Sequence, residues 1–154
     1  MSDGSKLYKR ILLPLDGSAL AEQAVPHAIA QAERFQAELV LLRVIEPLPK
    51  VGGGMSQTAF ERAEGEMKAW ALGYLEDLAA GVKEQGIPVQ VVTMMGHPHT
   101  AIVRFAEANQ VDLIVISTRG HSGLSRWLMG SVADRVLRGA KAPVLLVRAS
   151  KENK

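Results

Sequence analysis

Runs with the character of strands and of helices alternate along the whole chain, and this alternation restricts the fold more than any other feature. Five short apolar runs predict strands at residues 10–15, 38–45, 88–95, 112–117 and 143–148. Between them, apolar residues at helical spacing predict helices at 18–35, about 57–85, 98–108 and 131–140. Because the strands are continuous Val, Ile and Leu runs, they are typical of a parallel sheet that helices cover on both faces.

Local signals refine these helices. Ser18 stands where it can cap the first helix, and Pro26 should bend that helix or displace its start. The sequence His97-Pro98-His99 contains two metal-ligand types, but with no third ligand in view it is typical of a helix entry. We expect Trp70 and Trp127 to be packing residues.

The composition excludes several classes of protein. With no cysteine, the chain can form neither a disulfide framework nor a thiolate metal site. No apolar run approaches the roughly 20 residues of a membrane span, and the polar first residues do not resemble a signal peptide. We therefore expect a soluble cytoplasmic protein without a membrane partner, with one domain over residues 9–148, a flexible N-terminus at 1–8 and a tail at 149–154.

The segment between the fourth strand and the last helix has the features of an anion site. It runs from Ser117 to Ser131 and contains Gly120, Gly123 and Gly130. A glycine-rich loop that leads into a helix presents unpaired backbone N–H groups and the positive end of the helix dipole. The alternative is that these glycines form plain turns and that Ser131 only caps the helix.

The same segment resembles a known family. Gly120, followed by nine residues and Gly130-Ser131, is similar to the nucleotide loop of the universal stress proteins. Residues 130–137, 142–147 and 9–18 resemble that family as well. Ser117 stands where the family motif has its first Gly, and a Ser is small enough to leave room for a phosphate group.

The resemblance implies a fold and a ligand. The fold is a three-layer, adenine-nucleotide alpha hydrolase-like sandwich with a doubly wound parallel sheet in the order 3-2-1-4-5. The ligand is ATP, or ADP or AMP, with Mg²⁺, bound where the strand order reverses. The implied site residues are Asp16, Val44, Ser117, Thr118, Arg119, Gly120, His121, Gly123, Gly130 and Ser131.

Asp16 follows the first strand, so this strand order places it across a crevice from the glycine-rich segment. Its carboxylate would hold a ribose hydroxyl or the Mg²⁺ ion. The alternative is that Asp16 only forms a turn before the next helix. The backbone of Val44 matches the family position that contacts adenine, although the residue alone is typical of a core valine.

Charge and motifs limit the chemistry further. Residues 119–154 hold eight Lys or Arg and only two acids, and this basic end coincides with the anion segment. Nucleic acid would require a broader basic surface, so a small phosphorylated ligand fits better. The chain has no P-loop, no paired catalytic carboxylates and no nucleophile elbow, so we expect no more than slow ATP hydrolysis. A nucleotide-transferring enzyme would need a catalytic motif that the chain lacks.

Two functions remain at this point. One is an ATP-binding regulatory module of the stress response, and the alternative is a nucleotide-free dimerisation or scaffold module of the same fold. Both involve self-association, because residues 143–147 form an apolar last strand that should lie at the sheet edge. A twofold axis beside that edge would pair it with its own copy as a homodimer.

Overall fold

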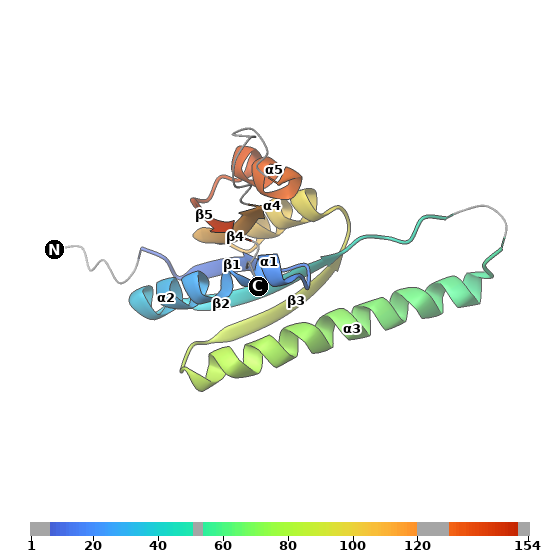
Figure 1. The fold of residues 1–154 in the computed structure, drawn as a ribbon, viewed down its shortest axis with the longest axis horizontal. Helices are drawn as coiled ribbons and strands as arrows, with labels where there is room; N and C mark the ends of the chain where they lie inside the picture. Colours follow the sequence, from blue (N-terminus) through green and yellow to red (C-terminus); the bar gives the residue numbers. More distant parts are fainter. Residues whose placement is uncertain (1–6, 51–53, 120–129, 151–154) are drawn as a thin grey trace.

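The computed structural model describes residues 7–50, 54–119 and 130–150, in which strands and helices alternate as the sequence predicts (Figure 1). The elements are β1 (Arg10–Pro14), α1 (Ala19–Glu22), α2 (Val25–Phe35), β2 (Glu38–Ile45), α3 (Gln57–Glu84), β3 (Val89–Met95), α4 (Pro98–Ala108), β4 (Leu113–Arg119), α5 (Ser131–Gly139) and β5 (Val144–Ala149). Most of the predicted boundaries lie within one residue of the observed ones.

The five strands form one parallel sheet in the order β3-β2-β1-β4-β5, which confirms the predicted topology. β1 is central and pairs with β2 along its whole length. On its other side the register joins only Ile11 to Leu113 and Leu12 to Ile114. The strand order therefore reverses at β1 and β4, and these two strands stop pairing well before their carboxyl ends.

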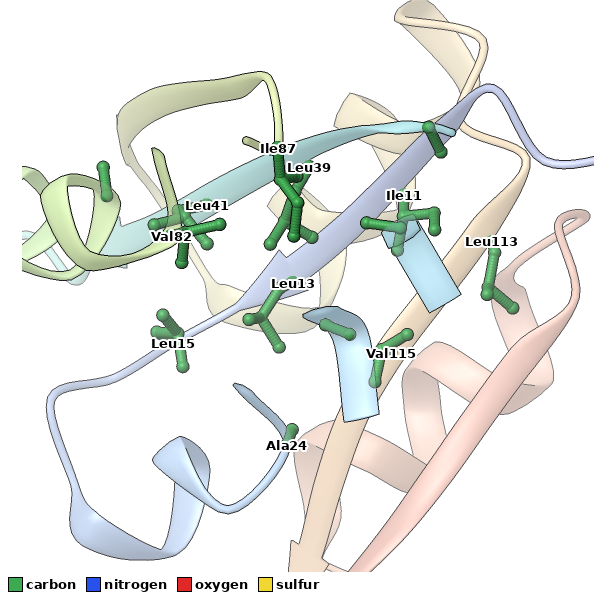
Figure 2. Close-up of a cluster of buried hydrophobic side chains, with 14 of the residues drawn as sticks. Ile11, Leu13, Leu15, Ala24, Leu39, Leu41, Val82, Ile87, Leu113 and Val115 are labelled. Atoms are coloured by element: carbon green, nitrogen blue, oxygen red, sulfur yellow. The ribbon is translucent and has the colours of Figure 1, made fainter. Parts of the chain in front are cut away.

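Helices cover both faces of the sheet, so there are two hydrophobic cores. On one face, Ile11 and Leu13 of β1 pack with side chains from α2 and α3 (Figure 2). On the other face, Leu12 packs with side chains from α4 and α5. Because neighbouring residues of a strand point to opposite faces, the apolar run of β1 serves both cores. This confirms the three-layer arrangement.

The first predicted helix is divided in two. Ser18 caps α1, since its Oγ accepts a hydrogen bond of 3.1 Å from the backbone N–H of Ala21. The helix ends after one turn, and α2 begins at Val25 with Pro26 in its first turn. A proline is tolerated there because the first N–H groups of a helix have no partner within it. The predicted effect of Pro26 is confirmed.

Only the second half of α3 packs on the sheet. The helix has 28 residues, and those of them that are buried are Ala71, Leu75, Ala79 and Val82. At 1.5 Å per residue it is about 42 Å long, and its N-terminal half extends past the strands (Figure 1). Trp70 lies near the point where packing ends and is 63% exposed. The expectation that Trp70 is a packing residue is therefore wrong.

β5 lies at the sheet edge, as the sequence predicts. Leu145 packs on one core, while Val144 and Leu146 pack on the other. The backbone N–H of Ile114 in β4 donates to the carbonyl of Pro143, at 2.9 Å. Parallel pairing therefore turns the peptide groups of Leu145 toward β4 and those of Val144 and Leu146 toward the open edge.

In the part of the chain that the structure describes, no helix combines the length and the apolar character that crossing a membrane would require.

Candidate functional site

A large open cavity lies where the strand order reverses. Its volume is about 1290 Å³, and residues from the carboxyl ends of β1, β2 and β4 line it together with residues from α1, α3 and the first turns of α4 and α5. Parallel α/β sheets bind their ligands at this position, because the loops that leave the two central strands diverge there. The cavity brings together Asp16, Val44, Ser117, Thr118, Gly130 and Ser131 from the predicted site.

The turn between β1 and α1 forms one lip of this cavity. Asp16 is exposed and lines the cavity, and its Oδ1 accepts a hydrogen bond of 2.8 Å from the backbone N–H of Ser18. Gly17 has φ +86°, a left-handed conformation that favours glycine. Asp16 thus forms the turn that the alternative interpretation predicted. The same carboxylate also faces the cavity, so the turn holds it in place.

The end of β4 forms the opposite lip. β4 continues to Arg119, two residues beyond its predicted end, so Thr118 and Arg119 belong to a strand rather than to a loop. Thr118 is buried, and its Oγ1 accepts a hydrogen bond of 3.2 Å from the N–H of Gly130. The Ser117 hydroxyl donates to the carbonyl of Ala21 at 3.3 Å. These bonds fix the end of β4 to the start of α5 and to α1.

The N-terminus of α5 opens into the cavity. Gly130 is the N-cap, with φ −49° and ψ 139°, and its carbonyl accepts the first helical hydrogen bond from Asp134. Ser131 is already the first helical residue, so the interpretation of Ser131 as the cap is wrong. A glycine cap has no side chain to bond the first N–H groups, and Gly130, Ser131, Val132 and Ala133 all line the cavity. This end of α5 is suited to an anion.

Because Gly130 rather than Ser131 caps α5, replacing Ser131 by Ala should have only a small effect on stability. Loss of an N-cap hydroxyl would cost about 1 kcal/mol of stability, but Ser131 is exposed and is not the cap. We expect the free energy of unfolding to change by less than about 0.5 kcal/mol, as for other exposed positions. Urea denaturation measures this change, and Ser18→Ala, which removes an observed cap, is the matched variant that should lose about 1 kcal/mol.

Side chains from β2 and α4 complete the cavity. Val44 is half-buried near the end of β2. His97 is the N-cap residue of α4, followed by Pro98, so the predicted helix entry is confirmed. His97 and His99 both line the cavity. Within the described ranges, no group of three or more His, Asp or Glu residues is gathered in a way that could hold a metal ion.

A cluster at the α3 side of the cavity was missed by the sequence analysis. The Arg43 guanidinium lies over two rings of α3, with its Cζ 4.7 Å from the ring centroid of Trp70 and 5.4 Å from that of Tyr74. The two rings are stacked with their centroids 6.2 Å apart. Arg43 and Trp70 line the cavity. A charged residue inside the apolar run of β2 was the available signal, because such a residue needs a partner or an exit to solvent.

Tyr74 links this cluster to α1. Its hydroxyl donates a hydrogen bond of 2.8 Å to Oε1 of Glu22. Burial, followed by this bond, raises the pKa of Tyr74 well above its ordinary value. The phenol therefore remains a neutral donor at physiological pH, and the bond joins α3 to the helix that follows Asp16.

Gly120, His121 and Gly123 of the predicted site lie outside the described residues, as does the side chain of Arg119. Trp127, which the sequence predicts to be a packing residue, also lies outside the described residues.

Comparison with known proteins identifies the family of this chain. The model of the universal stress protein family matches residues 7–148. The chain belongs to the universal stress protein family. A member of this family from Methanocaldococcus jannaschii, MJ0531, is 37% identical over 150 residues, which cover 97% of this chain and 88% of that protein. This confirms the family that the sequence motifs resemble.

Solved structures of universal stress proteins share the fold. That of MJ0577, also from Methanocaldococcus jannaschii, is similar with a TM-score of 0.75 at 27% identity, and the match covers 95% of this chain and 99% of that one. A universal stress protein described as a complex with cAMP matches with a TM-score of 0.70 at 25% identity, over 93% of this chain and 98% of that one. A universal stress protein from Arabidopsis thaliana, at 18% identity and a TM-score of 0.66, shows the same fold.

Proposed function

We propose that this universal stress protein is a regulatory module that binds an adenine nucleotide, with ATP as the first candidate. The observation that carries the proposal is the N-terminus of α5. It opens into a large cavity at the strand-order reversal, and its glycine cap offers no side chain to the first N–H groups. Backbone N–H groups and a helix dipole at this position are suited to phosphate.

In this proposal the ligand lies across both lips of the cavity. The phosphates contact Gly130 and Ser131 at the start of α5, with Arg135 of the same helix beside the cavity as a positive charge. Asp16 on the opposite lip accepts hydrogen bonds from the ribose, and the end of β2 at Val44 contacts the base. The related universal stress protein described as a complex with cAMP supports an adenine nucleotide as the ligand class.

We propose that Mg²⁺ enters with the nucleotide rather than as a resident ion. Asp16 is a single carboxylate at the cavity, and Mg²⁺ in proteins is commonly held by one or two carboxylates together with the phosphates of a substrate. Phosphoryl transfer needs further positive charge at the transferred group, typically a Lys of a P-loop. The sequence contains no such motif, so the proposed role is binding, with hydrolysis slow at most.

The test is thermal stabilisation by ATP. A ligand present at 100 times its Kd adds about 2.7 kcal/mol to the free energy of unfolding, which for a domain of this size raises the Tm by several degrees. We expect ATP with Mg²⁺ to give this shift in a scanning fluorimetry experiment with millimolar nucleotide. If ATP, ADP and AMP all leave the Tm unchanged, the nucleotide proposal is wrong and a nucleotide-free module is favoured.

We also propose that the protein is a homodimer that forms through β5. The strand lies at the sheet edge, and the outward peptide groups of Val144 and Leu146 have no partner strand among the described residues. An apolar edge strand of this kind is a template for pairing with a second chain. An isologous antiparallel pair would close the assembly at two subunits. This interface needs no nucleotide, so it is compatible with either candidate function.

A further inference from the structure

The wall of the cavity on the α3 side differs chemically from the phosphate end. We call it the α3 wall, and it consists of Ala63, Glu66, Met67 and Trp70 of α3 together with Arg43 of β2, all of which line the cavity. The Glu66 carboxylate is ion-paired with Arg62 of the same helix, at 3.1 Å. The three apolar residues, Ala63, Met67 and Trp70, lie at spacings of four and three in the N-terminal half of the helix. They therefore form an apolar stripe on one side of α3.

Trp70 is an unusual residue for an exposed position. It is 63% exposed beside the cavity, although a Trp normally buries most of its large aromatic surface. Met67 lies one turn away on the same wall. Aromatic rings, methionine sulfur and the arginine guanidinium each make favourable contacts with planar aromatic groups. The α3 wall thus gathers the side chains that bind a planar ring.

Arg43 adds hydrogen-bond donors to this wall. A guanidinium carries five N–H donors, yet Nη1 of Arg43 is buried and has no hydrogen-bond partner among residues 7–50, 54–119 and 130–150. Neither a hydrogen bond nor an ion pair joins the rest of the guanidinium to another described residue. Packing holds it in place, because a Cβ on Gly17 would overlap Nη1 and the rings of Trp70 and Tyr74 lie under its Cζ. This packing closes Nη1 off from the cavity, so the N–H groups of Arg43 that could meet a ligand acceptor are those of Nε and Nη2.

The cavity extends beyond the part that a mononucleotide is proposed to occupy. Its volume is about 1290 Å³, which is above the range of about 300–1000 Å³ that is typical of pockets for small-molecule ligands. The phosphate end at Gly130 and the α3 wall at Trp70 belong to this one cavity. A ligand confined to the phosphate end, Asp16 and Val44 would leave the α3 wall empty.

We propose that the α3 wall is a second ring-binding subsite and that the full site takes a dinucleoside polyphosphate. This inference rests on the proposed nucleotide function. The first nucleoside and the phosphates occupy the end formed by Asp16, Val44 and Gly130. The second heterocyclic ring stacks on Trp70, and the acceptor atoms on its edge face the N–H groups at Nε and Nη2 of Arg43.

The experiment compares ATP with diadenosine tetraphosphate by isothermal titration calorimetry. Base stacking on an aromatic side chain strengthens binding by about ten-fold or more, so we expect the dinucleotide to bind at least about ten-fold more tightly than ATP. Trp70→Ala should bring the ratio of the two Kd values to about two or less. Leu72→Ala is the matched control, because Leu72 is 40% exposed on the same helix and does not line the cavity.

Fluorescence adds a direct readout of the contact. The chain has two tryptophans, so Trp127→Phe leaves Trp70 as the only reporter. In that background the dinucleotide should quench the emission more strongly than ATP does at equal saturation. Arg43→Met should also lower the Kd ratio, while Arg43→Lys, which keeps the charge, should retain part of it. Thermal unfolding of each variant without ligand shows whether it is folded.

The outcomes separate the two proposals. If ATP binds and the dinucleotide binds no more than about two-fold more tightly, the second subsite is refuted while the proposed function stands. If Trp70→Ala weakens both ligands by the same factor, Trp70 contacts the mononucleotide itself, and the second subsite is again refuted. If neither ligand binds the wild-type protein, the proposed function fails first.

Discussion

Gly130→Val will abolish the stabilisation by ATP while leaving the protein folded. Gly130 caps α5 with φ −49° and ψ 139°, so its backbone is not in the left-handed conformation that favours glycine. Its position lines the cavity at the helix N-terminus, where a valine side chain would fill the space that phosphate oxygens need to reach the N–H groups. At an ATP concentration of 100 times the wild-type Kd, the loss would amount to the full 2.7 kcal/mol or so.

The measurement is a paired Tm series, with and without ATP, for the variant and the wild type. Gly65→Val is the matched control, because Gly65 lies in α3 with no atom within 4 Å of an added Cβ and does not line the cavity. That control should keep the whole shift. A Gly130→Val protein with normal helicity and a normal ATP shift would show that the phosphates do not bind at α5.

Leu146→Pro will convert the proposed dimer to a monomer. The N–H of Leu146 points to the open edge of β5, so a proline there removes a donor from the dimer interface without removing a hydrogen bond to β4. Antiparallel pairing of two β5 strands uses those outward N–H and C=O groups. A proline at 146 offers no N–H to the partner strand, and its ring occupies the space where that strand would pair. The residue before it, Leu145, is already in a strand, which is the conformation a following proline requires.

The assembly is measured by light scattering after size-exclusion chromatography at micromolar concentration. The wild type should have twice the mass of the 16.6 kDa chain, and the proline variant should have the mass of one chain. Leu146→Ala loses the same core contacts on that face but keeps the N–H, so it should remain a dimer. A wild-type protein that elutes as a single chain without nucleotide would refute the interface.

The fold could be predicted almost completely from periodicity. Each strand is a short apolar run bounded by turn residues, and each helix has a regular apolar stripe, so both element types were assigned with small errors at their ends. The largest boundary error is at β4, which continues through Thr118 and Arg119. Polar residues ended the predicted strand, but the pairing of these positions with Arg148 and Ala149 of β5 keeps them in the sheet.

The site could be predicted only in part, because a sequence does not specify how far a helix extends past its sheet. Trp70 continues the same apolar stripe as Ala71 and Leu75, so its spacing is that of a core residue. The neighbouring Ala71 is buried, whereas Trp70 is on the side of α3 that lines the cavity and stays exposed. Arg43 was missed for a related reason, because its partners come from α3 and from the turn at Gly17, which no local pattern brings together.

The cap of α5 shows a different limit. Gly130 and Ser131 are both acceptable N-cap residues, and a shift of one position decides whether the serine hydroxyl or the bare glycine backbone faces the helix start. The hydrogen bond from Gly130 to Thr118, twelve residues earlier, accompanies the observed arrangement. This contact depends on tertiary structure, so the sequence alone did not distinguish the two possibilities.

The short pairing between β1 and β4 has a mechanical consequence. It divides the sheet into two plates, β3-β2-β1 and β4-β5, that are joined along only two register positions. Asp16 belongs to the first plate, whereas Thr118 and Gly130 are attached to the second. A molecule that contacts both parts would bridge the junction between β1 and β4. It would then bear part of any force that separates the two parts of the sheet. This role needs no chemical turnover, because a bound molecule would add its own contacts to those that already join the two parts, such as the hydrogen bond between Ser117 and Ala21.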